Sequence, residues 1–147
     1  MKLGVCQMSV SEKLETNTKK IIGFIEHAAA QNIDIIGFPE MALTGYTKEI
    51  LDDEKMNDTV RQSLSKIRET CEVFNTAAIV GHPYKKGDEL YNSTSVFLPD
   101  GNTYTYDKMY PTEVESEYFE SGKKNPLVFT YRGKKIGVMI CRDQNYP

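Results

Sequence analysis

The stretch Gly137-Val138-Met139-Ile140-Cys141-Arg142-Asp143-Gln144-Asn145-Tyr146-Pro147 begins as an uncharged apolar run and then turns polar. The apolar part is typical of a buried strand, and Cys141 stands where it stops. In α/β sheets the carboxyl ends of strands carry the chemistry. Glu40 also follows an apolar run, over residues 33–38, and Lys108 follows a short strand predicted over residues 103–106. We therefore expect a thiol, a carboxylate and an amine to meet at one end of a sheet.

The rest of the chain supplies the elements of such a sheet. Helical periodicity predicts helices over residues 13–31, ending at Asn32, and over residues 60–74. Apolar runs predict strands over residues 3–8, 33–38, 77–81, 91–98, 103–106, 127–131 and 135–141. A loop is expected over residues 82–90, and an acidic, solvated connection over residues 52–57. This order indicates an α/β fold in which a mixed sheet carries helices on one face.

Composition limits the classes of protein to consider. A chain of 147 residues corresponds to about one domain, here residues 1–147. Hydrophobic residues make up 39% and charged residues 27%, as in a globular protein. The net charge is −3 and no basic stripe is present, so no nucleic-acid partner is expected. No apolar run approaches the ~20 residues of a membrane span, so no membrane partner is expected either.

The beginning of the chain and its cysteines indicate the compartment. The first residues break at Gln7 without a long apolar core, which argues against a signal peptide. Three cysteines without a CxxC pair argue against a disulfide framework or a zinc site. They favour a reducing compartment, and we therefore expect a cytoplasmic protein.

Cys141 has two interpretations from its position alone. Cysteine is among the most buried residue types, so core packing is expected for Cys6 and Cys71. For Cys141, position alone favours core packing and a nucleophilic role equally. A thiol attacks only as the thiolate and needs a base or a positive neighbour. Glu40 could take the proton, and Lys108 could stabilise the thiolate and then a tetrahedral oxyanion. The backbone amide after Cys141 is a second candidate oxyanion donor.

A cysteine–histidine site is a competing hypothesis. His27 lies on a predicted helix and is most simply a surface residue. His82 follows a predicted strand and could reach the site. The glutamate and the lysine already supply a base and an oxyanion donor, so this hypothesis is the weaker one.

Three ordered motifs resemble those of the nitrilase superfamily of carbon–nitrogen hydrolases. Residues 38–46, Phe-Pro-Glu-Met-Ala-Leu-Thr-Gly-Tyr, resemble the first motif. Tyr-Asp-Lys at 106–108, followed by Glu115, Phe119 and Gly122, resembles the second. Residues 137–147 resemble the third, and Tyr-Asn-Ser at 91–93 resembles a familiar strand. The resemblance covers the whole chain and departs from the family at residues 109–111, Met-Tyr-Pro.

The resemblance implies a role for each matching residue. Cys141 resembles the nucleophile, Glu40 the general base and Lys108 the lysine that stabilises the oxyanion. Glu115 resembles the second glutamate, which positions the lysine. Its neighbours Glu113 and Glu117 have the wrong offset from the lysine and are interpreted as part of a solvated acidic face.

The resemblance also implies a pocket, a fold and an assembly. Tyr46 is expected to line the substrate pocket, and Arg142 is expected to contribute to substrate binding. The implied fold is a four-layer α-β-β-α sandwich, of which this chain carries the N-terminal part. The implied enzyme has no metal or cofactor, forms a thioester and assembles as a homo-oligomer.

Two functions follow from these motifs. The first is hydrolysis of a small-molecule amide or N-carbamoyl amine. The second is a non-catalytic nitrilase-like module that binds or assembles. The second is considered because the family's domain continues past the cysteine motif, whereas this chain ends there, apparently truncated, and is expected to expose an apolar face and a strand edge.

Overall fold

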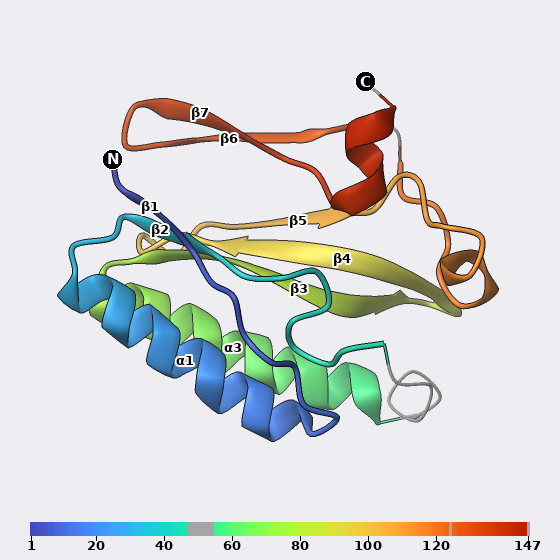
Figure 1. The fold of residues 1–147 in the computed structure, drawn as a ribbon, viewed down its shortest axis with the longest axis horizontal. Coiled ribbons are helices and arrows are strands. Elements are labelled where there is room, and N and C mark those ends of the chain that lie inside the picture. Colours follow the sequence, from blue (N-terminus) through green and yellow to red (C-terminus); the bar gives the residue numbers. More distant parts are fainter. Residues whose placement is uncertain (47–54, 124, 147) are drawn as a thin grey trace.

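The computed structural model describes residues 1–46, 55–123 and 125–146. Two long helices, a five-stranded sheet and a two-stranded hairpin lie in successive layers (Figure 1). The helices cover one face of the sheet and the hairpin covers part of the other. The beginning of the expected acidic connection over residues 52–57 lies outside the described residues, as does Pro147 at the end of the third motif.

The five-stranded sheet is mixed, as the sequence predicts. Its strands are β1 (Leu3–Val5), β2 (Ile35–Gly37), β3 (Ala77–Lys86), β4 (Glu89–Phe97) and β5 (Thr103–Asp107), in the order β1-β2-β3-β4-β5. The pairs β1–β2 and β2–β3 are parallel, and β3–β4 and β4–β5 are antiparallel. Strands β2 and β5 therefore run in the same direction, and their carboxyl ends lie at the same edge of the sheet.

Helices α1 (Leu14–Ala30) and α3 (Met56–Phe74) pack side by side on one face. Their apolar stripes bury Ile21, Ile25, Ile67 and Cys71 against the sheet. Helix α1 ends just before Asn32, whose φ of +57° is left-handed, as the sequence predicts. No helix among the described residues is long and apolar enough to cross a bilayer.

The opposite face of the sheet is covered by the hairpin of β6 (Leu127–Tyr131) and β7 (Lys134–Val138). Phe129, Val138 and Ile140 form a second apolar core with side chains of the sheet. At the turn of the hairpin, Arg132 forms an ion pair with Asp34, and the Tyr131 hydroxyl donates to the Asp34 carbonyl at 3.3 Å. The hairpin is thus fixed to the sheet by apolar contacts and by a polar anchor at its turn.

The predicted loop over residues 82–90 is mostly strand. Strand β3 continues to Lys86 and pairs with β4 throughout, leaving a tight turn at Gly87, whose φ is +61°. Strand β2 pairs with β3 only as far as Ile79. At Pro83 one side of β3 is therefore an open edge, where a proline's missing amide costs no ladder bond.

The prediction of a buried strand over residues 135–141 is wrong about where the strand ends and about how much of it is buried. Strand β7 stops at Val138, and Cys141 begins the 3₁₀ helix η2 (Cys141–Asn145). Val138 and Ile140 are buried, whereas Met139 between them is 61% exposed. The apolar run forms one strand of a hairpin that packs on the sheet with one face only. Only alternate side chains of the run therefore face the core.

Candidate active site

Glu40 lies in the loop over residues 38–46, directly after β2. The loop rests on β3 because Gly81 has no side chain. A Cβ there would lie 2.5 Å from the Met41 amide nitrogen and 2.7 Å from the Pro39 carbonyl oxygen. The Leu43 amide also donates to the Gly81 carbonyl at 3.1 Å. These contacts hold the Glu40 backbone against the sheet.

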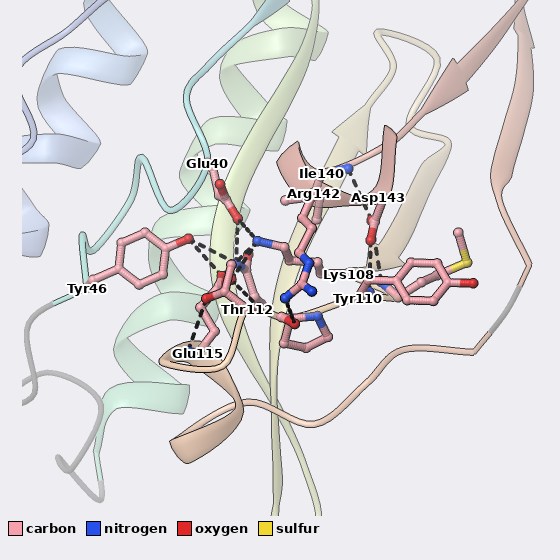
Figure 2. A network of polar contacts seen from close by, with 12 residues as sticks. Glu40, Tyr46, Lys108, Tyr110, Thr112, Glu115, Ile140, Arg142 and Asp143 are labelled. Atoms are coloured by element: carbon pink, nitrogen blue, oxygen red, sulfur yellow. Dashed lines mark hydrogen bonds and ion pairs between the residues drawn. The ribbon is translucent and has the colours of Figure 1, made fainter. Parts of the chain in front are cut away.

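Lys108 follows β5, and its backbone amide donates to the Asn92 carbonyl at 2.8 Å. Its side chain is only 1% exposed. Its Nζ lies 2.7 Å from Glu40 Oε1 and 2.8 Å from both Oε1 and Oε2 of Glu115 (Figure 2). The structure therefore brings Glu40, Lys108 and Glu115 into one ionic cluster, in which Lys108 and Glu115 are buried and Glu40 is partly exposed.

Glu115 opens the 3₁₀ helix η1 (Glu115–Glu117) and is buried, whereas Glu113 and Glu117 are exposed. The Thr112 amide donates to Glu115 Oε2 at 2.8 Å. Gly122 lets the end of this segment return to the lysine, because a Cβ there would lie 2.3 Å from the Asp107 carbonyl oxygen. The second motif thus folds back on Lys108 and places one of its glutamates beside the ammonium.

Burial and charge oppose each other in this cluster. Burial raises the pKa of Glu115, but hydrogen bonds from Lys108, Thr112 and Asn92 outweigh it and bring the pKa to about 2. Burial lowers the pKa of Lys108, and the hydrogen bonds and charges of Glu115 and Glu40 reverse that effect and raise it. Glu115 is therefore a carboxylate and Lys108 an ammonium at neutral pH.

Two polar side chains complete the cluster. The Tyr46 hydroxyl donates to Glu115 Oε1 at 3.1 Å, and the ring packs edge-on against Phe119. Burial and the charges of Glu40 and Glu115 raise the pKa of Tyr46, so it stays a neutral donor. Asn92 Nδ2, from β4, lies 2.8 Å from Glu40 Oε1 and 2.8 Å from Glu115 Oε1.

Cys141 is exposed and borders a cavity of about 130 Å³ that Glu40 and Asn92 also line. Phe38, Ile79 and Ile140 supply apolar walls. The backbone at Cys141 is left-handed, with a φ of +46°. Non-glycine residues in this region carry strain and are often found at functional sites. Cys141 and Glu40 thus line the same small cavity, one from the hairpin layer and the other from the loop after β2.

Asp143 ties the cysteine turn to the lysine loop. Its carboxylate is completely buried and accepts the Tyr106 hydroxyl at 2.6 Å and the Tyr110 amide at 2.9 Å. It also accepts the amides of Ile140 at 3.3 Å and of Met109 at 3.4 Å. Ile140 directly precedes Cys141, and Met109 and Tyr110 directly follow Lys108. Figure 2 shows Asp143 bonded to Ile140 on one side and to Tyr110 on the other.

The remaining predicted residues lie around this centre. The Arg142 side chain donates to the Pro111 carbonyl at 3.2 Å and lies over the Tyr146 ring. Its backbone amide is in the first turn of η2, where helical geometry provides no acceptor. Tyr46 is not among the described residues that line the cavity, because its hydroxyl is directed into the ionic cluster.

Neither histidine contacts the cluster. The ring nitrogens of His82 lie 2.9 Å from the Pro83 carbonyl oxygen and 2.8 Å from Ser95 Oγ. Burial lowers the pKa of His82 to about 4. His27 is exposed on α1 beside Gln31. Over the described part of the chain, no group of three or more His, Cys, Asp or Glu side chains is arranged to hold a metal ion.

Comparison with known proteins identifies the family. A family model described as carbon-nitrogen hydrolase matches residues 2–147. The chain belongs to the carbon–nitrogen hydrolase family. It is 30% identical over 135 residues to a glutamine-dependent NAD(+) synthetase of Acinetobacter baylyi and 29% identical over 136 residues to a nitrilase of Pyrococcus abyssi. Those alignments cover 88% and 90% of the chain.

Solved structures of this family share the fold. The glutamine-dependent NAD+ synthetase of Acinetobacter baumannii superposes with a TM-score of 0.88 at 28% identity, over 98% of this chain and 28% of that one. An amidase of Nesterenkonia reaches 0.90 at 17% identity, over 99% and 57% of the two chains. The nitrilase-type fold is thereby confirmed. The chain spans 24% of the Acinetobacter baylyi synthetase and 52% of the Pyrococcus nitrilase.

Sequence reasoning missed two residues of this carbon–nitrogen hydrolase site. Asn92 was visible as an amide inside an otherwise strand-forming run, and Asp143 as part of the third motif. Neither signal assigns a role, because an asparagine in a strand and an aspartate after a cysteine occur in many settings. Their roles appear only when the sheet and the hairpin bring distant segments together.

Proposed function

We propose that this chain carries the catalytic centre of an amidase-type hydrolase in which Cys141 is the nucleophile. One observation carries the proposal: Glu40, which is 2.7 Å from the Lys108 ammonium, lines the same cavity as Cys141. A base, a cation held beside that base and a nearby thiol are the groups that acyl transfer through a thioester requires.

The reaction follows from these groups. Glu40 takes the thiol proton, and the Cys141 sulfur attacks the carbonyl carbon of the amide. The oxyanion receives hydrogen bonds from Lys108 and from the Arg142 amide. The tetrahedral intermediate collapses, and protonated Glu40 gives its proton to the departing ammonia or amine. Water, deprotonated by Glu40, then cleaves the thioester and restores the thiol.

Lys108 has a donor to spare for the oxyanion. Its ammonium has three N–H groups. One contacts Glu40, and both Glu115 oxygens lie at the same distance of 2.8 Å from Nζ. One N–H shared between the two Glu115 oxygens leaves the third for substrate. Glu115 thus fixes the position and charge of the lysine.

The substrate class has two candidates. The first is a small neutral amide or N-carbamoyl amine. The second is the side-chain amide of glutamine, favoured by the identity of 30% to 32% with synthetases described as glutamine-dependent. Ammonia release from simple aliphatic amides, carbamoyl amines and glutamine separates these candidates. Release from none of them would favour the non-catalytic module.

Alkylation of the thiol tests its activation without turnover. Cys141 is exposed and Cys71 is buried, so a comparison between these two thiols reports only access. The informative comparison is the iodoacetamide rate at Cys141 in the wild type and in Glu40→Gln. We expect the substitution to slow alkylation at least tenfold, with Glu113→Gln as the matched control. Equal rates would refute Glu40 as the base.

The cytoplasmic location and the homo-oligomer stay predictions. Size-exclusion chromatography with light scattering tests the second, and a monomer over a wide range of protein concentration would contradict it.

A further inference from the structure

We propose that Asn92 is a positioning residue of this site, whose side-chain amide holds Glu40 and Glu115 in place as two carboxylates around the single ammonium of Lys108. The inference rests on the proposed function, because it assigns a role within the same acid–base cluster. Asn92 comes from the middle of the chain, on β4, and belongs to none of the three motifs that carry the nucleophile, the base and the lysine.

The contacts of the amide repeat those of the ammonium. Asn92 Nδ2 lies 2.8 Å from Glu40 Oε1 and 2.8 Å from Glu115 Oε1. Lys108 Nζ lies 2.7 Å and 2.8 Å from the same two oxygen atoms. Each of these oxygens is therefore shared between a charged donor and a neutral one. The four groups form a closed ring, in which no carboxylate can move without breaking two contacts.

The backbone of Asn92 extends this control to the lysine. Its carbonyl accepts the Lys108 amide at 2.8 Å. Its Nδ2 also lies 3.1 Å from the Tyr46 hydroxyl. One residue of a rigid central strand thus touches every charged member of the cluster, and it also lines the cavity that Cys141 borders.

The charge balance explains why a neutral donor is needed. Two acidic side chains share the single ammonium of Lys108, so each needs a further donor to satisfy its oxygens. A neutral N–H stabilises both anions without competing with Lys108 for them as a second cation would. Asparagine supplies two such N–H groups on one nitrogen.

The orientation of the amide supports its use as a donor alone. Asn92 Oδ1 is buried, and no hydrogen-bond partner for it is found in the described part of the chain. Rotating the amide by 180° would point this oxygen at two carboxylate oxygens and replace two hydrogen bonds by two contacts between acceptors. The amide therefore keeps its nitrogen on the carboxylates although its own acceptor is unsatisfied, which is the pattern of a group selected for its donors.

A purely structural role for Asn92 predicts a different outcome from a positioning role. If the role is structural, loss of Asn92 lowers stability without changing the protonation of the cluster. Ser95 provides the matched control: it lies on the same strand, is 3% exposed and hydrogen-bonds to His82, but its side chain faces the opposite side of the sheet. Ser95→Ala removes a buried polar contact from β4 without touching the cluster.

The decisive experiment follows the carboxyl ¹³C signal of Glu115, assigned with Glu115→Gln, against pH in the wild type, Asn92→Ala, Asn92→Asp and Ser95→Ala. Loss of a neutral donor destabilises the carboxylate, so we expect the midpoint to rise by about one pH unit in Asn92→Ala. It should rise further in Asn92→Asp, which is nearly isosteric and adds a third acid. Ser95→Ala should leave the midpoint unchanged.

The titration keeps this inference separate from the proposed function, because it needs no substrate. Where the chain hydrolyses an amide, the acid limb of its kcat/KM profile should move to higher pH in Asn92→Ala and not in Ser95→Ala. A midpoint in both Asn92 variants within 0.2 of the wild type, or an equal shift in Ser95→Ala, overturns the role of Asn92. Absence of ammonia release refutes the proposed function, while the Glu115 midpoint still decides on Asn92.

Discussion

Asp143→Asn is the substitution that tests most directly how the two halves of the site are joined. The carboxylate Oδ2 accepts the Tyr106 hydroxyl and the amides of Ile140 and Met109, and Oδ1 accepts the Tyr110 amide. Asparagine keeps only one oxygen. Three donors converge at the Oδ2 position, so the oxygen will stay there and the new NH₂ group will face the Tyr110 amide.

The cost follows from this geometry. One hydrogen bond to a charged acceptor is lost and two donors oppose each other, which costs about 2 kcal/mol. The contact at 2.6 Å with Tyr106 changes from a charged to a neutral acceptor and adds about 1 kcal/mol. We therefore expect the free energy of unfolding to fall by about 3 kcal/mol.

Urea unfolding at pH 7 measures this loss, and amide hydrogen exchange locates it. The amides of Tyr110 and Ile140 should exchange faster in the variant, because both donate to the altered group. Asp88→Asn, at the exposed turn between β3 and β4, removes the same charge and serves as the control. A loss below 0.5 kcal/mol for Asp143→Asn, or equal losses in both variants, would refute the reasoning.

Three further predictions concern the loop of Glu40 and two buried ionisable groups. Gly81→Ala should destabilise the fold and slow amide hydrolysis, because its Cβ would meet backbone at 2.5 Å, whereas Gly23→Ala, with open space, should stabilise α1 by up to about 1 kcal/mol in urea unfolding. Glu115, with a pKa of about 2 in the fold against 4.5 in a free chain, contributes stability that is complete above pH 4.5 and lost as pH falls towards 2. Unfolding in urea across that range should show a slope that Glu115→Gln lacks. His82, with a pKa of about 4 against 6.5, is neutral in the fold and loses its contribution between pH 6.5 and 4. His82→Gln should flatten that window while amide hydrolysis is retained, and abolished hydrolysis in a folded variant would revive the cysteine–histidine hypothesis.

Local patterns were sufficient for the elements that form from their own residues. The apolar stripe from Leu14 to Ala28 and the asparagine at position 32 predict α1 nearly to its ends. The parallel strands were recognisable for the same reason, since short apolar runs between helices usually form buried strands. Glu40 and Lys108 could then be placed together, because β2 and β5 end at the same edge.

Elements that depend on partners distant in the sequence could not be predicted from local patterns. Residues 82–86 contain a proline and two lysines and resemble a loop, but they form strand because β4 pairs with them along their whole length. The run before Cys141 looks fully buried, yet it lies in a hairpin with one exposed face. Asn92 and Asp143 lie in stretches that resemble the family, but the stretches assign them no role, because each acquires its role from segments that lie far from it in the sequence.

The division of the site between two layers explains why these missed residues matter. Glu40 and Lys108 are fixed at one edge of the five-stranded sheet, whereas Cys141 belongs to the layer of the hairpin. Packing of Phe129 and Val138 sets the distance between the layers but is non-directional, so it cannot fix the height or rotation of the thiol over the cavity. Directional contacts must do so, and Asp143 supplies three of them between the cysteine turn and the segment around Lys108. The left-handed backbone at Cys141 is held from the same side, since the Ile140 amide before it and the Asp143 carboxylate after it bond across the turn. The position of Cys141 relative to Glu40 is therefore set by the buried carboxylate of Asp143.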